Sequence, residues 1–126
     1  MRTELLIGGS WTAGDRERLP VENPATGDVV AEVALATIDD VGAAVDAAAG
    51  RGADALEAMP VFERARLLHR VADGIDARAD ELARLLSAES GKPLAGEAMG
   101  EIEESADIFR WSAEEAKRLE TPSFGT

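Results

Sequence analysis

The stretch Glu89-Ser90-Gly91-Lys92-Pro93 marks the junction between the two most strongly helical regions of the chain. A glycine just past a helix can adopt the left-handed conformation that closes the last turn, and a proline two residues later cannot continue the helix. We therefore expect one helix to end at Gly91, a turn through Lys92 and Pro93, and a second helix a few residues later.

Apolar residues before this junction recur at alternating spacings of four and three, which predicts one continuous helical face that opens after Pro60. The face comprises Val61, Ala65, Leu68, Ala72, Ile75, Ala79, Leu82 and Leu86. Gly74, followed by Asp76-Ala77-Arg78, predicts a break, so we expect two helices here instead of one.

A second apolar stripe follows the junction, between Ala95 and Leu119, and predicts another helix. Its members are Ala98, Ile102, Ala106, Phe109, Ala113 and Ala116. On the opposite side, Glu114 precedes Arg118 by four residues, the spacing and order that favour an ion pair along a helix.

The helical pattern begins at Thr37, where Thr37-Ile38-Asp39-Asp40 resembles a capping box with Thr37 as the N-cap. The expected apolar stripe is formed by Val41, Ala44, Val45, Ala48 and Ala49. Gly50 and Gly52 weaken the end of this helix, and a further helical piece is predicted from Ala53 to Met59.

Residues 1–36 favour β structure. Leu5-Leu6-Ile7, the turn signal Gly8-Gly9 and Ser10-Trp11-Thr12 predict one hairpin. A second hairpin is predicted from the extended segment Leu19–Glu22, the turn-forming run Asn23–Asp28 and a strand with Val29, Ala31, Val33 and Leu35 on one buried face.

These patterns predict a mainly α member of the α+β class. Residues 1–36 form a small β hairpin region, residues 37–119 an antiparallel layer of about four helices, and residues 120–126 an irregular tail. With 126 residues, the chain is long enough for a single domain or for a piece of a larger one.

The net charge of −12 argues against binding to nucleic acid or anionic membranes as the main activity, because the field of the protein repels phosphate. The absence of cysteine excludes disulfides, thiolate metal sites and a cysteine nucleophile within this chain. Neither a signal peptide nor a membrane span is predicted, so we expect a cytoplasmic protein.

Few residues suggest chemistry. No glycine-rich phosphate-binding motif is present, and His69 is the only histidine, which favours a structural or surface role for it. Trp11 and Trp111 are interpreted as packing residues. The residues alone therefore indicate an acidic, helical, non-catalytic module.

Five segments, in order, nevertheless resemble the opening of the NAD(P)-dependent aldehyde dehydrogenase superfamily. They are Leu6–Trp11 with Glu22–Asp28, Phe62–Leu68, Asp80–Ala83, Glu89–Leu94 and Arg110–Arg118. Within the last segment, Ala113-Glu114-Glu115-Ala116-Lys117-Arg118 is most similar to the succinate-semialdehyde dehydrogenase branch. Together they cover roughly residues 5–119.

The resemblance implies part of the α/β aldehyde dehydrogenase fold and a parent reaction in which NAD or NADP oxidises an aldehyde, such as succinate semialdehyde, to the acid. The family's cofactor loop, glutamate base and cysteine nucleophile come after this region. We therefore expect an N-terminal fragment of an oxidoreductase, with no catalytic or cofactor-binding residue in this chain, no cofactor bound to it, and no activity alone.

The resemblance also implies one structural site, for a monovalent cation. Its ligands would be the Glu89 carboxylate and a backbone carbonyl at Val21 or Glu22. A cation suits this place because a helix C-terminus presents unsatisfied carbonyls and the negative end of the helix dipole. The competing interpretation is that Glu89 is solvated and binds no ion.

Two functions remain open. The first is the inactive N-terminal part of an aldehyde dehydrogenase, whose partner is the remainder of the enzyme. The alternative is an independent acidic interaction or oligomerisation module. Exposed apolar faces at Ile102, Phe109 and Leu86 would drive self-association.

Overall fold

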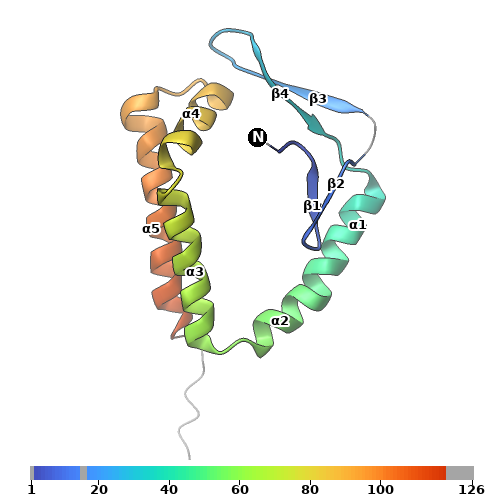
Figure 1. Ribbon diagram of the computed structural model, residues 1–126, viewed down its shortest axis with the longest axis vertical. Helices are drawn as coiled ribbons and strands as arrows, with labels where there is room; N and C mark the ends of the chain where they lie inside the picture. The colour runs from blue at the N-terminus through green and yellow to red at the C-terminus, as the bar shows by residue number, and fades with distance from the viewer. Residues whose placement is uncertain (1, 15–16, 119–126) are drawn as a thin grey trace, which may run out of the picture. The chain divides into compact units, whose positions relative to one another are not determined.

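The computed structural model describes residues 2–14 and 17–118, which form two compact units. Of the described residues, those up to 58 and residues 88–91 belong to the first unit, and residues 59–87 and 92–118 belong to the second. Four strands, α1 and α2 belong to the first unit, whereas α3, α5 and most of α4 belong to the second (Figure 1). Within the described ranges, no helix is long and apolar enough to span a bilayer.

The predicted first hairpin is confirmed. Strand β1 (Leu5–Ile7) pairs with β2 (Ser10–Thr12) in antiparallel register, with Leu6 opposite Trp11. Gly8 and Gly9 connect the strands at φ 57° and 85°, in the left-handed region that glycine enters without steric cost.

The second hairpin also forms. Strand β3 (Arg18–Glu22) pairs antiparallel with β4 (Val29–Ala34). Val21 faces Ala31 and Glu22 faces Val29, so Val30 is an extra residue in β4 and forms a β-bulge. A bulge bends the strand and interrupts the regular ladder at that point.

The predicted buried face of β4 is confirmed only in part: Ala31, Val33 and Leu35 are half-buried, but Val29 is not. Val29 is 57% exposed, and the one buried residue of β4 is Ala34, on the opposite face. The Ala34 N–H donates a hydrogen bond of 2.9 Å to the Thr3 carbonyl. The N-terminal segment therefore covers this end of the strand, a long-range contact that the alternation of residue types cannot indicate.

Helix α1 (Ile38–Ala47) begins with the predicted capping box. The Asp40 N–H donates to Thr37 Oγ1 at 3.1 Å, and the Thr37 N–H donates to Asp40 Oδ2 at 2.9 Å. A π-type turn, η1 (Ala48–Gly52), follows with Gly50 outside helical geometry, and α2 (Ala53–Ala58) continues. The predicted weakening at the glycines is confirmed.

The predicted apolar stripe of α1 coincides only in part with its packed face. Val41 and Val45 are 55% and 59% exposed, and no residue of α1 is buried. The side that lies against β1 carries Ala44 and Ala47, both half-buried. Alanine has no bulk beyond Cβ, so the strand can approach the helix there, while both valines stay more than half exposed.

In the second unit, α3 (Val61–Asp76) starts directly after Pro60, and α4 (Ala79–Ser90) follows the predicted break. Gly91 has φ +74°, as expected for a residue that ends a helix. The next helix begins later than predicted. Ala95 and Gly96 depart from helical geometry within the π-type turn η2 (Leu94–Ala98), and α5 runs from Met99 to Ala116.

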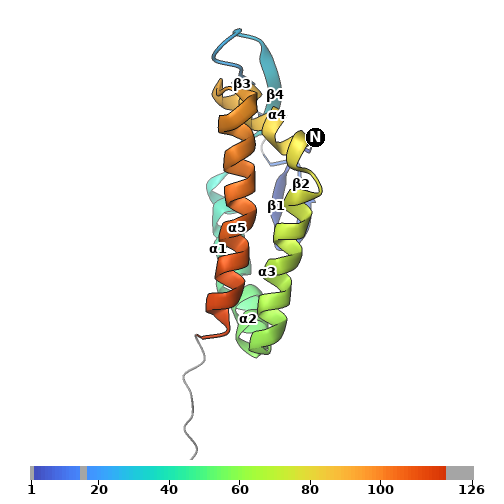
Figure 2. The same ribbon diagram turned by 90° about the vertical axis from the view of Figure 1, so that its left-hand side faces the viewer.

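Helices α3 and α5 pack side by side and antiparallel (Figure 2). Their buried residues are mostly alanines, which lets the two backbones come close: Val61, Ala65, Ala72, Ala106, Ala113 and Ala116. All of them belong to the two predicted stripes. The mainly α, α+β fold class is thus confirmed, while the predicted tail at residues 120–126 lies outside the described part of the chain.

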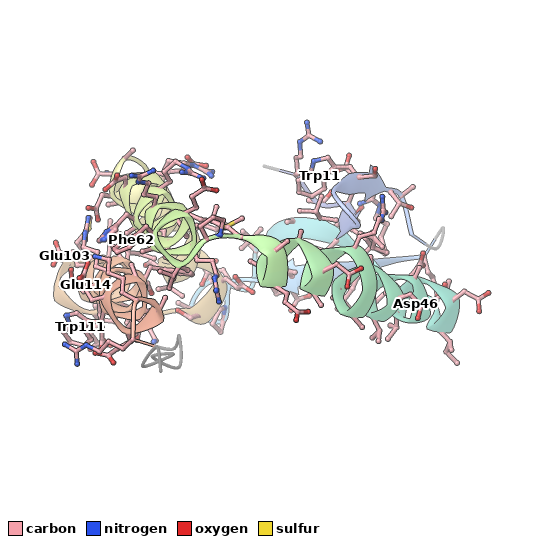
Figure 3. The ribbon with its side chains drawn as sticks, turned by 90° about the horizontal axis from the view of Figure 1, so that it is seen from below. Trp11, Asp46, Phe62, Glu103, Trp111 and Glu114 are labelled. Carbon is pink, nitrogen blue, oxygen red and sulfur yellow. The ribbon has the colours of Figure 1, made fainter. Side chains whose placement is uncertain are left out.

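The expectation of exposed faces at Ile102, Phe109 and Leu86 is wrong, because all three are half-buried. The exposed large apolar side chains of this unit include Phe62, Ile108 and Trp111, at 65%, 50% and 68%. Trp111 lies on the side of α5 that faces away from α3 (Figure 3), and therefore does not pack within this chain as expected.

Candidate functional site

The turn after β3 is fixed by Asn23. Its N–H donates to the Asp28 carbonyl at 2.8 Å, its own carbonyl accepts from the Gly27 N–H at 2.7 Å, and its side-chain Oδ1 accepts from the Ala25 N–H at 2.9 Å. Asparagine suits this position because its short amide can bond the backbone two residues ahead. The turn is therefore rigidly held at the point where β3 ends.

Gly91 lies against this turn within the first unit. A Cβ atom at Gly91 would lie 2.9 Å from Pro24 Cγ, closer than side chains approach in folded proteins. The residue therefore needs to be glycine for two reasons, its positive φ and the lack of space. This contact brings the end of α4 beside the turn that follows β3.

The three predicted cation ligands come from these two segments. Glu89 is exposed on the last turn of α4, Val21 is half-buried in β3, and Glu22 is exposed at the strand end, opposite the bulge. Across residues 2–14 and 17–118, no group of three or more His, Cys, Asp or Glu side chains could hold a metal ion. A cation here would depend on one carboxylate and on backbone carbonyls, so this site stays a prediction.

Within the second unit, Lys92 holds the turn that follows Gly91. The Ser87 hydroxyl donates to the Lys92 carbonyl at 2.6 Å, and Lys92 Nζ forms an ion pair with Glu101 of α5. Ser87 is one turn before the end of α4, so both ends of the turn are attached to helices. In this arrangement Lys92 binds a protein carboxylate.

His69 of α3 and Glu114 of α5 connect the two long helices. His69 Nε2 lies 3.2 Å from Glu114 Oε1, and Lys117 Nζ donates to both Glu114 oxygens at 2.7 and 2.8 Å. The Lys117 ammonium, and secondarily His69, hold the pKa of the Glu114 carboxyl below its usual value. Glu114 lies at the surface (Figure 3), so this cluster is a solvated cross-link between helices.

Glu114 does not pair with Arg118 as predicted. Arg118 instead pairs with Glu115, with 3.3 Å between Nη1 and Oε1. Glu114 does not pair with Arg118 because Lys117 and His69 both contact its carboxylate. His69 belongs to another helix, so its contact cannot be foreseen from spacing along α5.

Arg110 makes the second link between α5 and α3. Its guanidinium bonds the Asp76 carboxylate, contacts Asp107 Oδ1 at 3.1 Å and lies 3.8 Å from Asp73 Oδ1. Hydrogen bonding to Asp76, and then to Asp107, raises the pKa of Arg110 further above its usual value. Arg110 therefore stays charged and acts as a clamp.

None of these clusters brings a nucleophile to a general base. The whole sequence has no cysteine, and His69, its single histidine, contacts a carboxylate that a lysine already neutralises. Sequence reasoning did not predict the ion pairs of Lys92, Arg110 and His69. Residues that pair between different helices have no fixed separation along the sequence, so no pattern of residue types indicates them.

Sequence comparison identifies the family. The sequence profile of the aldehyde dehydrogenase family matches residues 11–125. The chain belongs to this family. The succinate-semialdehyde dehydrogenase [NADP(+)] of Escherichia coli (strain K12) is 42% identical over 119 residues, which are 94% of this chain and 24% of that protein.

Solved aldehyde dehydrogenases share the fold. The enzyme from Brucella melitensis biovar abortus 2308 matches with a TM-score of 0.88 at 35% identity, over 98% of this chain and 26% of that one. The NAD-dependent benzaldehyde dehydrogenase from Corynebacterium glutamicum matches with a TM-score of 0.87 at 31% identity, over 98% and 27%. The chain thus spans about a quarter of the length of the relatives it matches.

Proposed function

We propose that this chain forms the N-terminal supporting part of an aldehyde dehydrogenase and contributes no reacting group itself. The parent reaction would oxidise an aldehyde to the acid through a thiohemiacetal, with hydride transfer to NAD or NADP. The observation that carries this proposal is the family match over residues 11–125 of a sequence that contains no cysteine to form the thiohemiacetal.

Exposed apolar surface supports a role in packing against the rest of an enzyme. On α1, Ile38, Val41 and Val45 recur on one side of the helix and are 90%, 55% and 59% exposed. Apolar faces of this kind are normally covered by other parts of a protein. We infer that the remainder of the enzyme covers them.

A segment exchange tests the proposal. The chain would replace the matching segment of the Escherichia coli relative, and the chimera and the isolated chain would be assayed with succinate semialdehyde and NADP+. We expect turnover by the folded chimera and none by the chain alone. Turnover by the chain alone, or a folded but inactive chimera, would contradict the proposal.

Succinate semialdehyde is our proposed substrate, because the Escherichia coli relative carries that name at 42% identity. The benzaldehyde dehydrogenase that shares the fold names a competing class of substrate. The genomic DNA downstream of codon 126 can be sequenced to test this proposal. If it encodes a continuation with a cysteine nucleophile, the encoded enzyme should prefer succinate semialdehyde to benzaldehyde.

We also propose that Glu89 and a carbonyl at Val21 or Glu22 hold a structural monovalent cation. Support comes from the Gly91–Pro24 contact, which brings the two segments together, and from the irregular ladder at the bulge. Sodium or potassium, but not a large inert cation, should raise the melting temperature of the chain. The shift should disappear in Glu89→Gln, and an unchanged melting temperature would refute the site.

The alternative, a self-associating acidic module, is favoured by the same exposed faces of α1 and by Trp111. Light scattering of the purified chain separates the two cases. A dimer or larger assembly that persists on dilution would support the module, whereas a monodisperse monomer would contradict it. For the cell, we propose a cytoplasmic location, which fractionation would test.

A further inference from the structure

A groove in the first unit lies outside every site described so far. It has a volume of about 500 Å³ and runs between the β1–β2 turn and the end of α1. Its apolar lining includes Leu6, Ile7, Ala44 and Ala47, and its single charged lining residue is Arg51. The groove therefore combines aliphatic walls with one cation.

Arg51 differs from the other arginines described in this unit. Arg2 lies over the Trp11 ring at 4.8 Å from its centroid, and Arg18 donates to Thr3 Oγ1 at 3.0 Å and to the Glu32 carbonyl at 3.3 Å. Within the described part of the chain, by contrast, the Arg51 side chain forms neither an ion pair nor a hydrogen bond. Although the chain has 25 acidic residues and 13 basic ones, no carboxylate within residues 2–14 and 17–118 pairs with this guanidinium.

Glycine keeps the space next to Arg51 open. A Cβ atom at Gly8 would lie 3.5 Å from Ala47 Cβ and 3.6 Å from Arg51 Nη2. Any larger side chain at Gly8 would thus enter the space between the hairpin turn and the guanidinium. The glycine required by the turn also leaves room for a ligand beside the cation.

We propose that this groove binds a short aliphatic monocarboxylate. The guanidinium fork of Arg51 matches the two oxygens of a carboxylate, so the acid group would bind there in bidentate geometry. The aliphatic chain would lie along Leu6, Ile7 and Ala44, where its burial supplies hydrophobic binding free energy. Nothing in the proposed enzyme function requires this site.

Titration of the purified chain with hexanoate tests the proposal, with the amide shifts of Gly8, Gly9 and Gly52 followed by NMR. We expect saturable shifts at these residues. Hexanol has the same chain length without the charge. Its affinity should be lower than that of hexanoate by a factor of about ten or more, because it lacks the charge-assisted hydrogen bonds. Arg51→Gln should weaken hexanoate binding by a similar factor.

Two further variants make the result specific. Arg84→Gln removes an exposed arginine of α4 and should leave hexanoate binding unchanged. Ala47→Leu narrows the groove without changing its charge. This variant should weaken hexanoate binding. Shifts that grow linearly without saturation, equal binding of hexanol and hexanoate, or full binding by a folded Arg51→Gln chain would each overturn the proposal.

Discussion

Gly91 lies so close to Pro24 that a Cβ atom on the glycine would come within 2.9 Å of Pro24 Cγ. The two residues are far apart in the sequence, and each lies in a segment that was predicted as a turn on local grounds. Their contact joins the helix end to the Asn-Pro turn, and it explains why glycine at this position does more than close a helix.

Gly91→Ala should therefore lower the free energy of unfolding by about 2 kcal/mol, since it adds both left-handed strain and a collision. Gly27→Ala is a matched control, because Gly27 also has a positive φ, of 77°, but no atom within 4 Å of its Cβ position. That variant should cost only the strain, about 1 kcal/mol. Urea unfolding followed by circular dichroism would measure both, and equal losses would contradict a role for Pro24.

The capping box of α1 predicts an effect of pH on stability. Hydrogen bonds from the Thr37 N–H and hydroxyl lower the pKa of Asp40 from its usual 3.8. A carboxylate whose pKa is lower when folded stabilises the fold above the unfolded value, and this contribution is lost as the pH falls below about 3.8 through the folded pKa. Asp40→Asn should thus reduce stability at neutral pH and flatten its dependence below pH 4.

Asp39→Asn is the control for this experiment, because Asp39 occupies the same turn but makes no bond to the cap. Thr37→Ala should also cost about 1 kcal/mol, the usual value of an N-cap. If Asp39→Asn changed the acid unfolding curve as much as Asp40→Asn, general charge in the first turn would be the cause instead of the capping box.

The alanine interface between α3 and α5 should not tolerate larger residues. Ala106 is completely buried, so Ala106→Leu should destabilise the chain by about 1–3 kcal/mol through overpacking. Glu103→Leu places the same side chain on the exposed side of α5 (Figure 3) and should change stability by less than about 0.5 kcal/mol. Thermal unfolding would show a lower melting temperature for the first variant alone.

The Arg110 clamp should stabilise the helix pair in a salt-dependent way. Arg110→Gln should lower the melting temperature, and the loss should shrink as salt screens the ion pairs. A double-mutant cycle with Asp76→Asn would isolate the contact between the two helices. Additive effects of the two substitutions would mean that the Asp76 contact contributes nothing, and Arg84→Gln controls for the general loss of positive charge.

The sequence alone determined the local structure and the family. Thr37 and Asp40 predicted a helix start, Gly8-Gly9 a hairpin and Gly91 a helix end, because each preference depends on neighbours within a few residues. The two long apolar stripes predicted the buried alanines of α3 and α5 for the same reason, since helical periodicity is a local property.

Tertiary structure decided which of these features meet. The burial of Ala34 instead of Val29, the exposure of Val41 and the pairing of Glu114 with His69 all depend on residues that are distant in sequence. The same is true of the space beside Arg51, which exists because the Gly8 turn lies against α1. Local preference leaves such contacts open, because many partners have the same charge or apolar character and only the fold selects one.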